Sequence, residues 1–294
     1  MAVAIPERST AGAAVGDAVL EVVDLTKRFG GLAAVDGLTF NVSGGESFGI
    51  AGPNGAGKTT LFDAISGHTR ANAGHIVFRG EEIQQRSSHE ICHLGIARTF
   101  QVPAVFPEHT VLGNVLVGAY FGQRARLVPA TRFDADSVEQ AVRAATSVGL
   151  QGKLGATAGP LSLFDKKRLM MASALASNPK LLMLDEPVGG LNPRESDEVL
   201  DLVRSIRDRG VTVVLIEHDM RALMSISERV MVMNHGRLLF EGTPEDVQRE
   251  EEVIRVYLGT KTENRATRAD IGAVDELREW RESAKASDGD EADA

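Results

Sequence analysis

The 294-residue sequence has one cysteine, Cys92, and no apolar run approaching the roughly 18 residues that a membrane span requires. A single cysteine cannot form an intramolecular disulfide, so nothing argues for a secreted, disulfide-stabilised protein. The N-terminus, MAVAIPERST, lacks the basic start and following apolar stretch of a signal peptide. We therefore expect a soluble cytosolic protein.

Basic residues are also scarce, with 32 Lys and Arg against 41 Asp and Glu and a net charge of -9. A chain with this balance is not built around a broad nucleic-acid surface, and we expect no nucleic-acid partner. The last eight residues, SDGDEADA, hold four acids and no base. Because so much of the excess lies at one end, the acidity says little about other partners.

The two ends of the chain differ in composition from its middle. Residues 1–17 are small and polar without a period, and predict a disordered arm. Residues 261–294 are densely charged; apolar residues at every third position from Ile271 to Trp280 predict one short helix before the acidic end. The length of the whole chain suits one or two domains of roughly 100–200 residues, and residues 18–260 remain as its body, which we take as one domain.

Within the body, apolar strands alternate with helices, which indicates an α/β fold with a parallel sheet and helices packed on it. The strands are predicted at 20–25, 38–42, 47–51, 75–78, 181–184, 212–216, 229–234 and 237–241, the last two as a hairpin. The helices are predicted at 58–66, 111–121, 134–148, 165–177 and 194–209, with a last one opening at Thr243. Residues 88–150 are predicted to be mostly helical, as an insertion.

Residues 52–60, GPNGAGKTT, fit the pattern G-x-x-x-x-G-K-[ST] of a phosphate-binding loop. Small residues let successive N–H groups point at phosphate oxygens, and the following helix adds its positive N-terminal end. Lys58 would neutralise the β- and γ-phosphates, and the Thr59 hydroxyl would bind Mg²⁺. A chance match in a chain of this length is of order 1%. The predicted ATP-binding residues here are Gly52, Pro53, Asn54, Gly55, Ala56, Gly57, Lys58, Thr59 and Thr60.

Two further polar groups follow buried strands. In LLMLDEP, 181–187, Asp185 would hold Mg²⁺ and Glu186 would polarise the attacking water. His218 follows the strand at 212–216 and can reach a γ-phosphate. An acidic turn or a histidine after a strand is usually structural, but the phosphate-binding loop makes the catalytic interpretation stronger for all three residues.

With these motifs, residues 18–260 resemble the nucleotide-binding subunit of an ABC transporter, and most closely the ATP-binding proteins of branched-chain amino acid importers. The narrower segments that carry the resemblance are GIARTFQ (95–101), LDEPVGGLNPRE (184–195), VVLIEHDMRALMSISERVMVMNHGRLLFEGTPEDV (213–247) and VIRVYLG (253–259). The resemblance implies a P-loop NTPase with a RecA-like parallel sheet core, an antiparallel β subdomain and an inserted helical subdomain at about 88–165.

The resemblance also implies roles and partners. Phe29 matches the aromatic that stacks on adenine, with a core position as the alternative. Gln101 matches the glutamine that contacts Mg²⁺ and the attacking water, with an ordinary loop residue as the alternative. Residues 102–125 match the region that receives a membrane permease subunit. Members of the family work at the inner face of the cell membrane as dimers that enclose two ATP molecules, and importers use a separate solute-binding protein.

The signature motif departs from the family pattern Leu-Ser-Gly-Gly-Gln, because residues 161–165 read LSLFD. Ser162 remains at a helix start, where it can face a γ-phosphate, whereas Asp165 would repel phosphate unless it points away. The resemblance implies that each signature serves the partner's ATP. If the partner is a different subunit with an intact signature, the pair would have a strong site at this chain's P-loop and a weak one at the partner's.

Other functions stay open at this stage. A degenerate signature suits a nucleotide-gated binding subunit with weak hydrolysis, although intact Glu186 and His218 argue against it. An ATPase of a lipid or lipopolysaccharide exporter is a close relative. A cytosolic ABC ATPase of translation or DNA repair usually has two nucleotide domains or a long coiled coil, and residues 18–260 have neither. The solute is not readable: branched-chain amino acids, other amino acids, amides and urea are all candidates.

Overall fold

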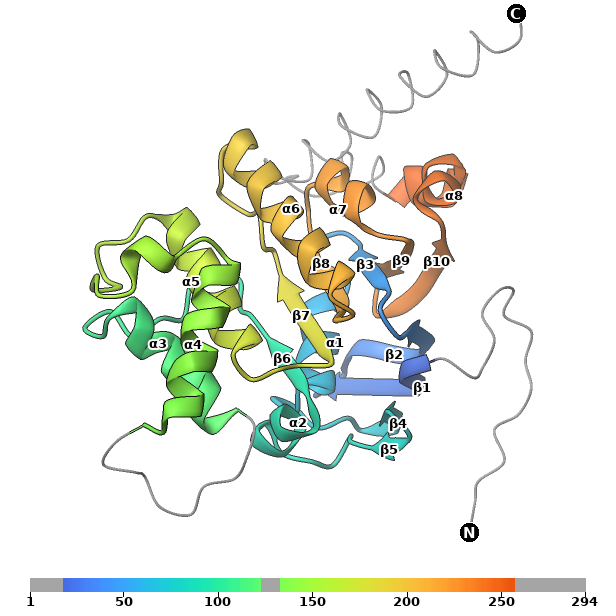
Figure 1. Cartoon of the computed structure of the whole chain (residues 1–294). Coiled ribbons are helices and arrows are strands. Elements are labelled where there is room, and N and C mark those ends of the chain that lie inside the picture. The colour runs from blue at the N-terminus through green and yellow to red at the C-terminus, as the bar shows by residue number, and fades with distance from the viewer. Residues whose placement is uncertain (1–17, 123–132, 257–294) are drawn as a thin grey trace, which may run out of the picture.

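The structure is a computed structural model that describes residues 18–122 and 133–256. The predicted N-terminal arm and the predicted tail at 261–294 lie outside these residues, so both stay predictions. The described chain forms two sheets and a set of helices, of which one group stands apart from the sheets (Figure 1).

The central sheet has six strands in the order β10-β9-β3-β8-β7-β6, and all neighbours are parallel except β10 and β9. Its strands are β3 (Ser47–Ala51), β6 (Ile96–Arg98), β7 (Leu181–Asp185), β8 (Thr212–Ile216), β9 (Arg229–Asn234) and β10 (Arg237–Gly242). Every residue of β3, β7 and β8 is buried. Such strands are covered on both faces, which explains their unbroken apolar sequences. The predicted parallel sheet is confirmed.

The second sheet is antiparallel and has the order β2-β1-β4-β5. Its strands are β1 (Ala18–Phe29), β2 (Leu32–Ser43), β4 (Ala73–Phe78) and β5 (Glu81–Glu82). Strands β1 and β2 are longer than predicted because they continue past the core to a tight turn at Gly30, whose φ of 58° suits glycine. This extension carries Phe29 to the tip of the hairpin.

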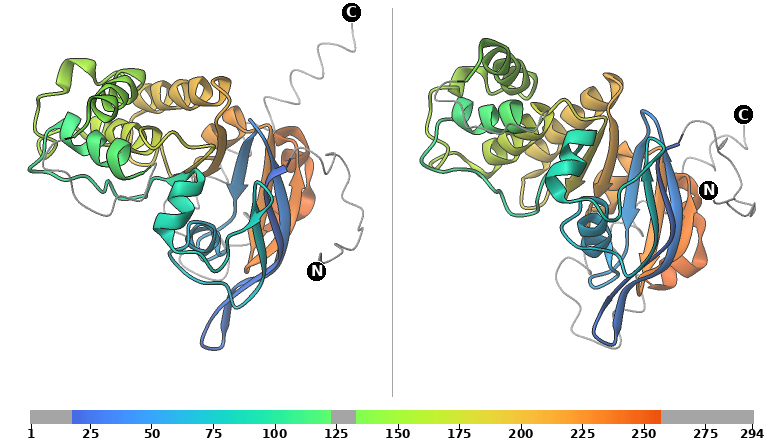
Figure 2. Two further views of the ribbon diagram at one scale, coloured as in Figure 1. Left: turned by 60° about the horizontal axis from the view of Figure 1, so that its bottom comes forward. Right: turned by 90° about the horizontal axis from the view of Figure 1, so that it is seen from below.

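The central sheet separates two apolar clusters, and alternate residues of one strand enter different clusters. In β7, Leu181 and Met183 pack with α1 (Lys58–Ile65) and the antiparallel sheet. Leu182 and Leu184 pack on the opposite side with α6 (Pro193–Asp208), α7 (Met220–Ile226) and the separate helices. The side views in Figure 2 show the antiparallel sheet and the separate helices at opposite ends of the molecule.

The separate helical group consists of α3 (Val111–Phe121), α4 (Ala135–Ser147) and α5 (Leu163–Leu175), with the single turn η1 (Gln151–Lys153) between α4 and α5. Helix α5 begins two residues before the predicted start because Ser162 caps it, accepting a hydrogen bond from the Asp165 N–H. The remaining helices are α2 (Ser88–Leu94) and α8 (Pro244–Arg249). Within the described ranges, no helix combines the length and apolarity needed to cross a bilayer.

One strand inside the stretch predicted to be mostly helical was missed. Residues 96–98 form β6, which pairs in parallel with β7. Three residues, Ile-Ala-Arg, are too few to show an alternating pattern. The strand has a functional consequence, because it ends at Arg98 and places Gln101 just beyond the carboxyl edge of the sheet.

Candidate nucleotide site

The phosphate-binding loop connects β3 to α1, as the sequence predicts. Gly57 has a φ of 102°, and a Cβ there would lie 2.1 Å from the Ala34 carbonyl oxygen, so only glycine fits. Gly55 also has a positive φ, of 79°, but its Cβ position is open. Lys58 is 6% exposed and its Nζ donates to the carbonyls of Gly52 and Pro53. The Lys58 ammonium is therefore held by carbonyls of its own loop, beside the N-terminus of α1, a position that favours bound anions.

A pocket of about 500 Å³ lies on this loop. Phe29 lines it from the β1–β2 hairpin and is 54% exposed, so the alternative of a core phenylalanine is wrong. Nζ of Lys27 lies 4.9 Å over the Phe29 ring, and an exposed ring beside a phosphate loop is suited to stack on a planar base. The other lining residues are Leu32, Ala33, Ala34, Asn54, Gly55, Ala56, Gly57, Lys58, Thr59, Thr60, Gln101, Glu186, Ile216, His218 and His235.

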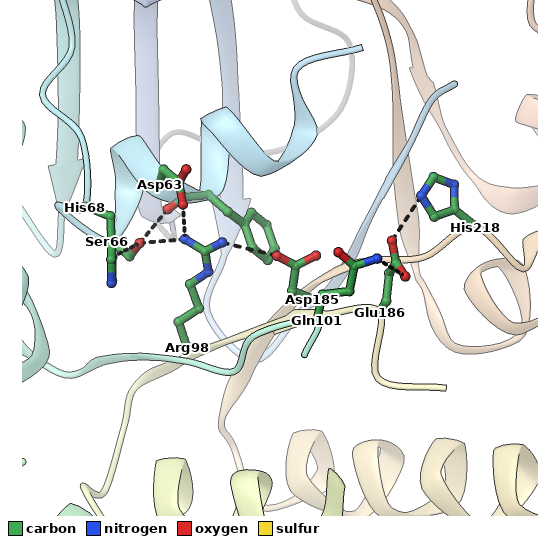
Figure 3. A network of polar contacts seen from close by, with 9 residues as sticks. Asp63, Ser66, His68, Arg98, Gln101, Asp185, Glu186 and His218 are labelled. Carbon is green, nitrogen blue, oxygen red and sulfur yellow. Dashed lines mark hydrogen bonds and ion pairs between the residues drawn. The ribbon is translucent and has the colours of Figure 1, made fainter. Parts of the chain in front are cut away.

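Glu186 lies at the mouth of this pocket, with both carboxylate oxygens engaged (Figure 3). Its Oε1 lies 3.0 Å from Nε2 of His218, and its Oε2 accepts a 2.8 Å hydrogen bond from Nε2 of Gln101. The hydrogen bonds from His218 and Gln101 hold the pKa of Glu186 below its usual value despite partial burial. Three residues that are distant in sequence thus contact one another at the pocket. The sequence motifs name each of them separately and do not show these contacts.

The backbone of Glu186 is in the left-handed region, with a φ of 48°, which is unusual for a residue with a side chain. Its N–H donates to the Ile216 carbonyl, and its own carbonyl accepts from Nζ of Lys167 at 2.6 Å. Lys167 comes from α5 and is 3% exposed. Burial lowers its pKa. Sequence reasoning missed this contact, because Lys167 is one of three consecutive basic residues in the sequence.

Glu217 is a second buried group that sequence reasoning missed, although it stands beside His218 in the EHDM segment. It is 2% exposed and accepts a 2.7 Å hydrogen bond from the Val188 N–H. Burial raises its pKa to about 8. Through this hydrogen bond, the carboxyl group of Glu217 connects the loop that follows Glu186 with the loop that contains His218.

Asp185 ends β7 and is also buried, with a side chain 5% exposed. Burial raises its pKa, and a 3.1 Å hydrogen bond from Arg98 opposes that shift. Thr59 offers a hydroxyl and Asp185 a carboxylate, while Gln101 donates through its amide nitrogen and keeps its amide oxygen as a ligand. Hydroxyl, carboxylate and amide oxygens are the donors that Mg²⁺ accepts, so these residues fit the predicted ion.

Comparison with known proteins agrees with this geometry. The ABC transporter family matches residues 35–189, and the family described as "Branched-chain amino acid ATP-binding cassette transporter" matches residues 237–262. The chain belongs to the ABC transporter family. It is an ATP-binding cassette and an ATPase, and the predicted P-loop fold is confirmed.

The curated relatives of this cassette include transport proteins from bacteria. The high-affinity branched-chain amino acid transport ATP-binding protein BraF of Pseudomonas aeruginosa is 40% identical over 82% of this chain and 98% of its own length. The corresponding protein LivG of Escherichia coli is 38% identical over the same shares. Among solved structures, the ADP conformation of MJ1267, an ATP-binding cassette of an ABC transporter, is 30% identical with a TM-score of 0.76, covering 82% of this chain and 99% of that one.

The signature segment of the cassette lies away from its own pocket, and Ser162 is not among the pocket-lining residues. Asp165 is 4% exposed and pairs with Lys153 and Arg168, which hold its pKa below the usual value although burial alone would raise it. The aspartate therefore points into the helical group and not toward solvent. Leu163, at a family glycine position, is 39% exposed. The departure from the family signature thus adds an exposed apolar side chain, Leu163, at the start of α5, while the charge of Asp165 is buried and paired.

Proposed function

We propose that this cassette is the ATP-hydrolysing subunit of an importer that takes up branched-chain amino acids, or a related small polar solute, through separate membrane subunits. The observation that carries the proposal is Glu186, which His218 and Gln101 hold at the mouth of the P-loop pocket. The relatives' names supply the class of solute. Nothing in the described residues favours the exporter alternative.

Hydrolysis would proceed by in-line attack of water on the γ-phosphate, with catalysis mostly by positioning and charge stabilisation. Lys58 and the loop N–H groups would hold the phosphates, and Phe29 would stack on adenine. Glu186, ionised and oriented, would polarise the water while His218 donates to the γ-phosphate. Mg²⁺, bound by Thr59, Gln101 and Asp185, would neutralise charge on the terminal phosphates.

The proposed partner surface for a permease lies between the helical group and the central sheet. A groove of about 330 Å³ includes Phe100, Phe106 and Val117, and the neighbouring Val102 is 75% exposed. Exposed apolar side chains around a groove are typical of protein interaction sites. This surface includes part of the predicted 102–125 region, of which residues 123–125 lie outside the described residues. Docking there would hold the cassette at the inner face of the membrane.

A second ATP-binding subunit would complete each site, with Ser162 facing the partner's ATP. Solved cassettes of the same fold include the dimeric MJ0796, which is 22% identical to this chain with a TM-score of 0.67. A solute-binding protein outside the membrane would deliver the solute. Whether the dimer joins identical or different subunits decides if the LSLFD segment serves one site or both.

The test is uptake of radiolabelled leucine into proteoliposomes that hold the assembled transporter, with ATP inside or outside. We expect uptake only with ATP on the side of the cassette. Phosphate release from the purified chain, alone and with its partner subunits, is measured in parallel. Nucleotide binding without phosphate release in either setting would instead support the nucleotide-gated binding subunit, which the altered signature favours.

A further inference from the structure

Arg98, the last residue of β6, lies between the P-loop helix and the strand that ends at Asp185 (Figure 3). Its side chain is 5% exposed. Its Nη1 donates to Asp63 of α1 at 2.6 Å, and its Nη2 donates to Oδ2 of Asp185 at 3.1 Å. The guanidinium thus bridges two carboxylates that are 122 positions apart in the sequence.

The position of the Arg98 guanidinium is fixed by more than these two ion pairs. Nη1 also donates to Oγ of Ser66, just beyond the end of α1, at 3.1 Å. The rings of Phe62 and Phe100 lie 5.4 and 5.0 Å from the guanidinium carbon. A planar group with several donors and two neighbouring rings has little freedom to rotate. A lysine has one ammonium and cannot reproduce this bridge.

The bridge leaves Asp185 half engaged. Oδ2 of Asp185 accepts from Arg98, while Oδ1 makes no hydrogen bond within residues 18–122 and 133–256. The same helix that is tied through Asp63 begins with Lys58 and Thr59. Arg98 therefore connects the Asp185 carboxylate, through hydrogen bonds, to the helix that carries the predicted phosphate and magnesium ligands Lys58 and Thr59.

Resting on the proposed function, we propose that Arg98 is a positioning residue for the magnesium–nucleotide complex. It orients the Asp185 carboxylate and fixes it relative to α1, so that one oxygen remains directed to the metal. Residues that orient a metal ligand from behind typically change metal affinity by about 10–100-fold when they are removed. Arg98 would consequently control the part of nucleotide binding that depends on Mg²⁺.

The chain offers a matched control in Arg229, the first residue of β9. Its guanidinium donates to Glu46 at 2.9 Å and to Glu241 at 2.8 Å, and it lies 4.9 Å from the Phe48 ring. Arg229 therefore repeats the arrangement of an arginine over a phenylalanine between two carboxylates. Neither of its carboxylate partners lies in α1 or belongs to the predicted magnesium ligands.

The experiment titrates the full-length chain with a fluorescent ATP analogue, once in MgCl₂ and once in EDTA, and records thermal unfolding. In the wild type, Mg²⁺ is expected to increase the affinity. Arg98→Met should reduce the Mg²⁺-dependent increase about tenfold and leave the affinity in EDTA within about twofold. The Mg²⁺-dependent increase of Arg98→Lys should lie between those of the wild type and Arg98→Met. Arg229→Met should lower the melting temperature and leave both affinities unchanged.

Three results would overturn the proposal: an unchanged Mg²⁺-dependent increase in Arg98→Met, an equal loss in MgCl₂ and EDTA, or the same loss in Arg229→Met. If Arg98→Met does not fold, Arg98→Lys carries the test, because it keeps the charge but not the bridge; an unchanged increase then overturns the proposal. A wild-type chain that binds no nucleotide in either solution would contradict the proposed function itself.

Discussion

The central sheet has an arginine at each end, and the two are used differently. Arg229, at the amino ends of the strands, forms ion pairs with Glu46 and Glu241. Arg98, at the carboxyl ends, donates to Asp185, the residue directly before Glu186 of the nucleotide pocket. The carboxyl ends of parallel strands and the N-terminus of α1 converge there, which favours a bound anion. Under our proposal, similar ion pairs serve stability at one end of the strands and ligand binding at the other.

The largest expected effect at the carboxyl ends comes from Glu186→Gln. Removing the carboxylate that we propose polarises the attacking water should lower ATP turnover of the assembled transporter by at least about 100-fold, with nucleotide binding retained. If this chain's P-loop forms the strong site, the matching change in a different partner subunit should cost less. Steady-state phosphate release compares the two variants, and equal losses would rule out the idea of one strong and one weak site.

At the amino ends, Arg229→Met should affect folding and leave turnover unchanged. The change leaves Glu46 and Glu241 without their cation in a partly buried place, which we expect to cost about 3 kcal/mol of unfolding free energy. Urea denaturation of the full-length chain measures that cost, and phosphate release checks the activity. A loss of turnover without a loss of stability would remove the distinction between the two ends.

Glu217, which follows the carboxyl end of β8, is expected to make the unfolding free energy of the protein depend on pH. Its pKa is about 8 in the folded chain against an ordinary value of 4.5, so the folded state binds more protons between these values. The stability that this group contributes is present below pH 4.5 and is lost as the pH rises toward 8. Relative to wild type, Glu217→Gln should gain about 2 kcal/mol between pH 6 and 8. Urea denaturation of both proteins measures this gain. A difference in urea midpoint between the two proteins that does not change from pH 6 to pH 8 would contradict the raised pKa of Glu217.

The smallest effect is expected at the signature segment. Ser162→Ala removes the cap of α5 and should cost about 1 kcal/mol of stability, whereas Ser162→Asn keeps a capping oxygen and should cost less. If the LSLFD segment serves a weak site, neither variant should lower transporter turnover by more than about threefold, roughly 0.6 kcal/mol of activation free energy. A much larger loss in both variants would show that the altered signature still supports full hydrolysis.

Much of the fold was predictable from the sequence because its signals are local. The strand at 212–216 and the helix at 111–121 match the predictions residue for residue, since a continuous apolar run and a capped helix need few neighbours to be recognised. The hairpin of β9 and β10 is also confirmed, with positive φ at His235 and Gly236. Strand β6 was missed because three residues carry no period.

The sequence by itself determined the phosphate-binding loop, because its glycines, lysine and threonine are held by a continuous stretch between one strand and one helix. Only the tertiary structure decided what the other polar residues contact. Arg98 is 87 residues from Asp185, and Gln101 is 85 residues from Glu186. Such distant pairs meet because parallel strands bring their carboxyl ends to one edge of a sheet. The burial of Asp165 and the exposure of Phe29 likewise follow from packing, which no local pattern records.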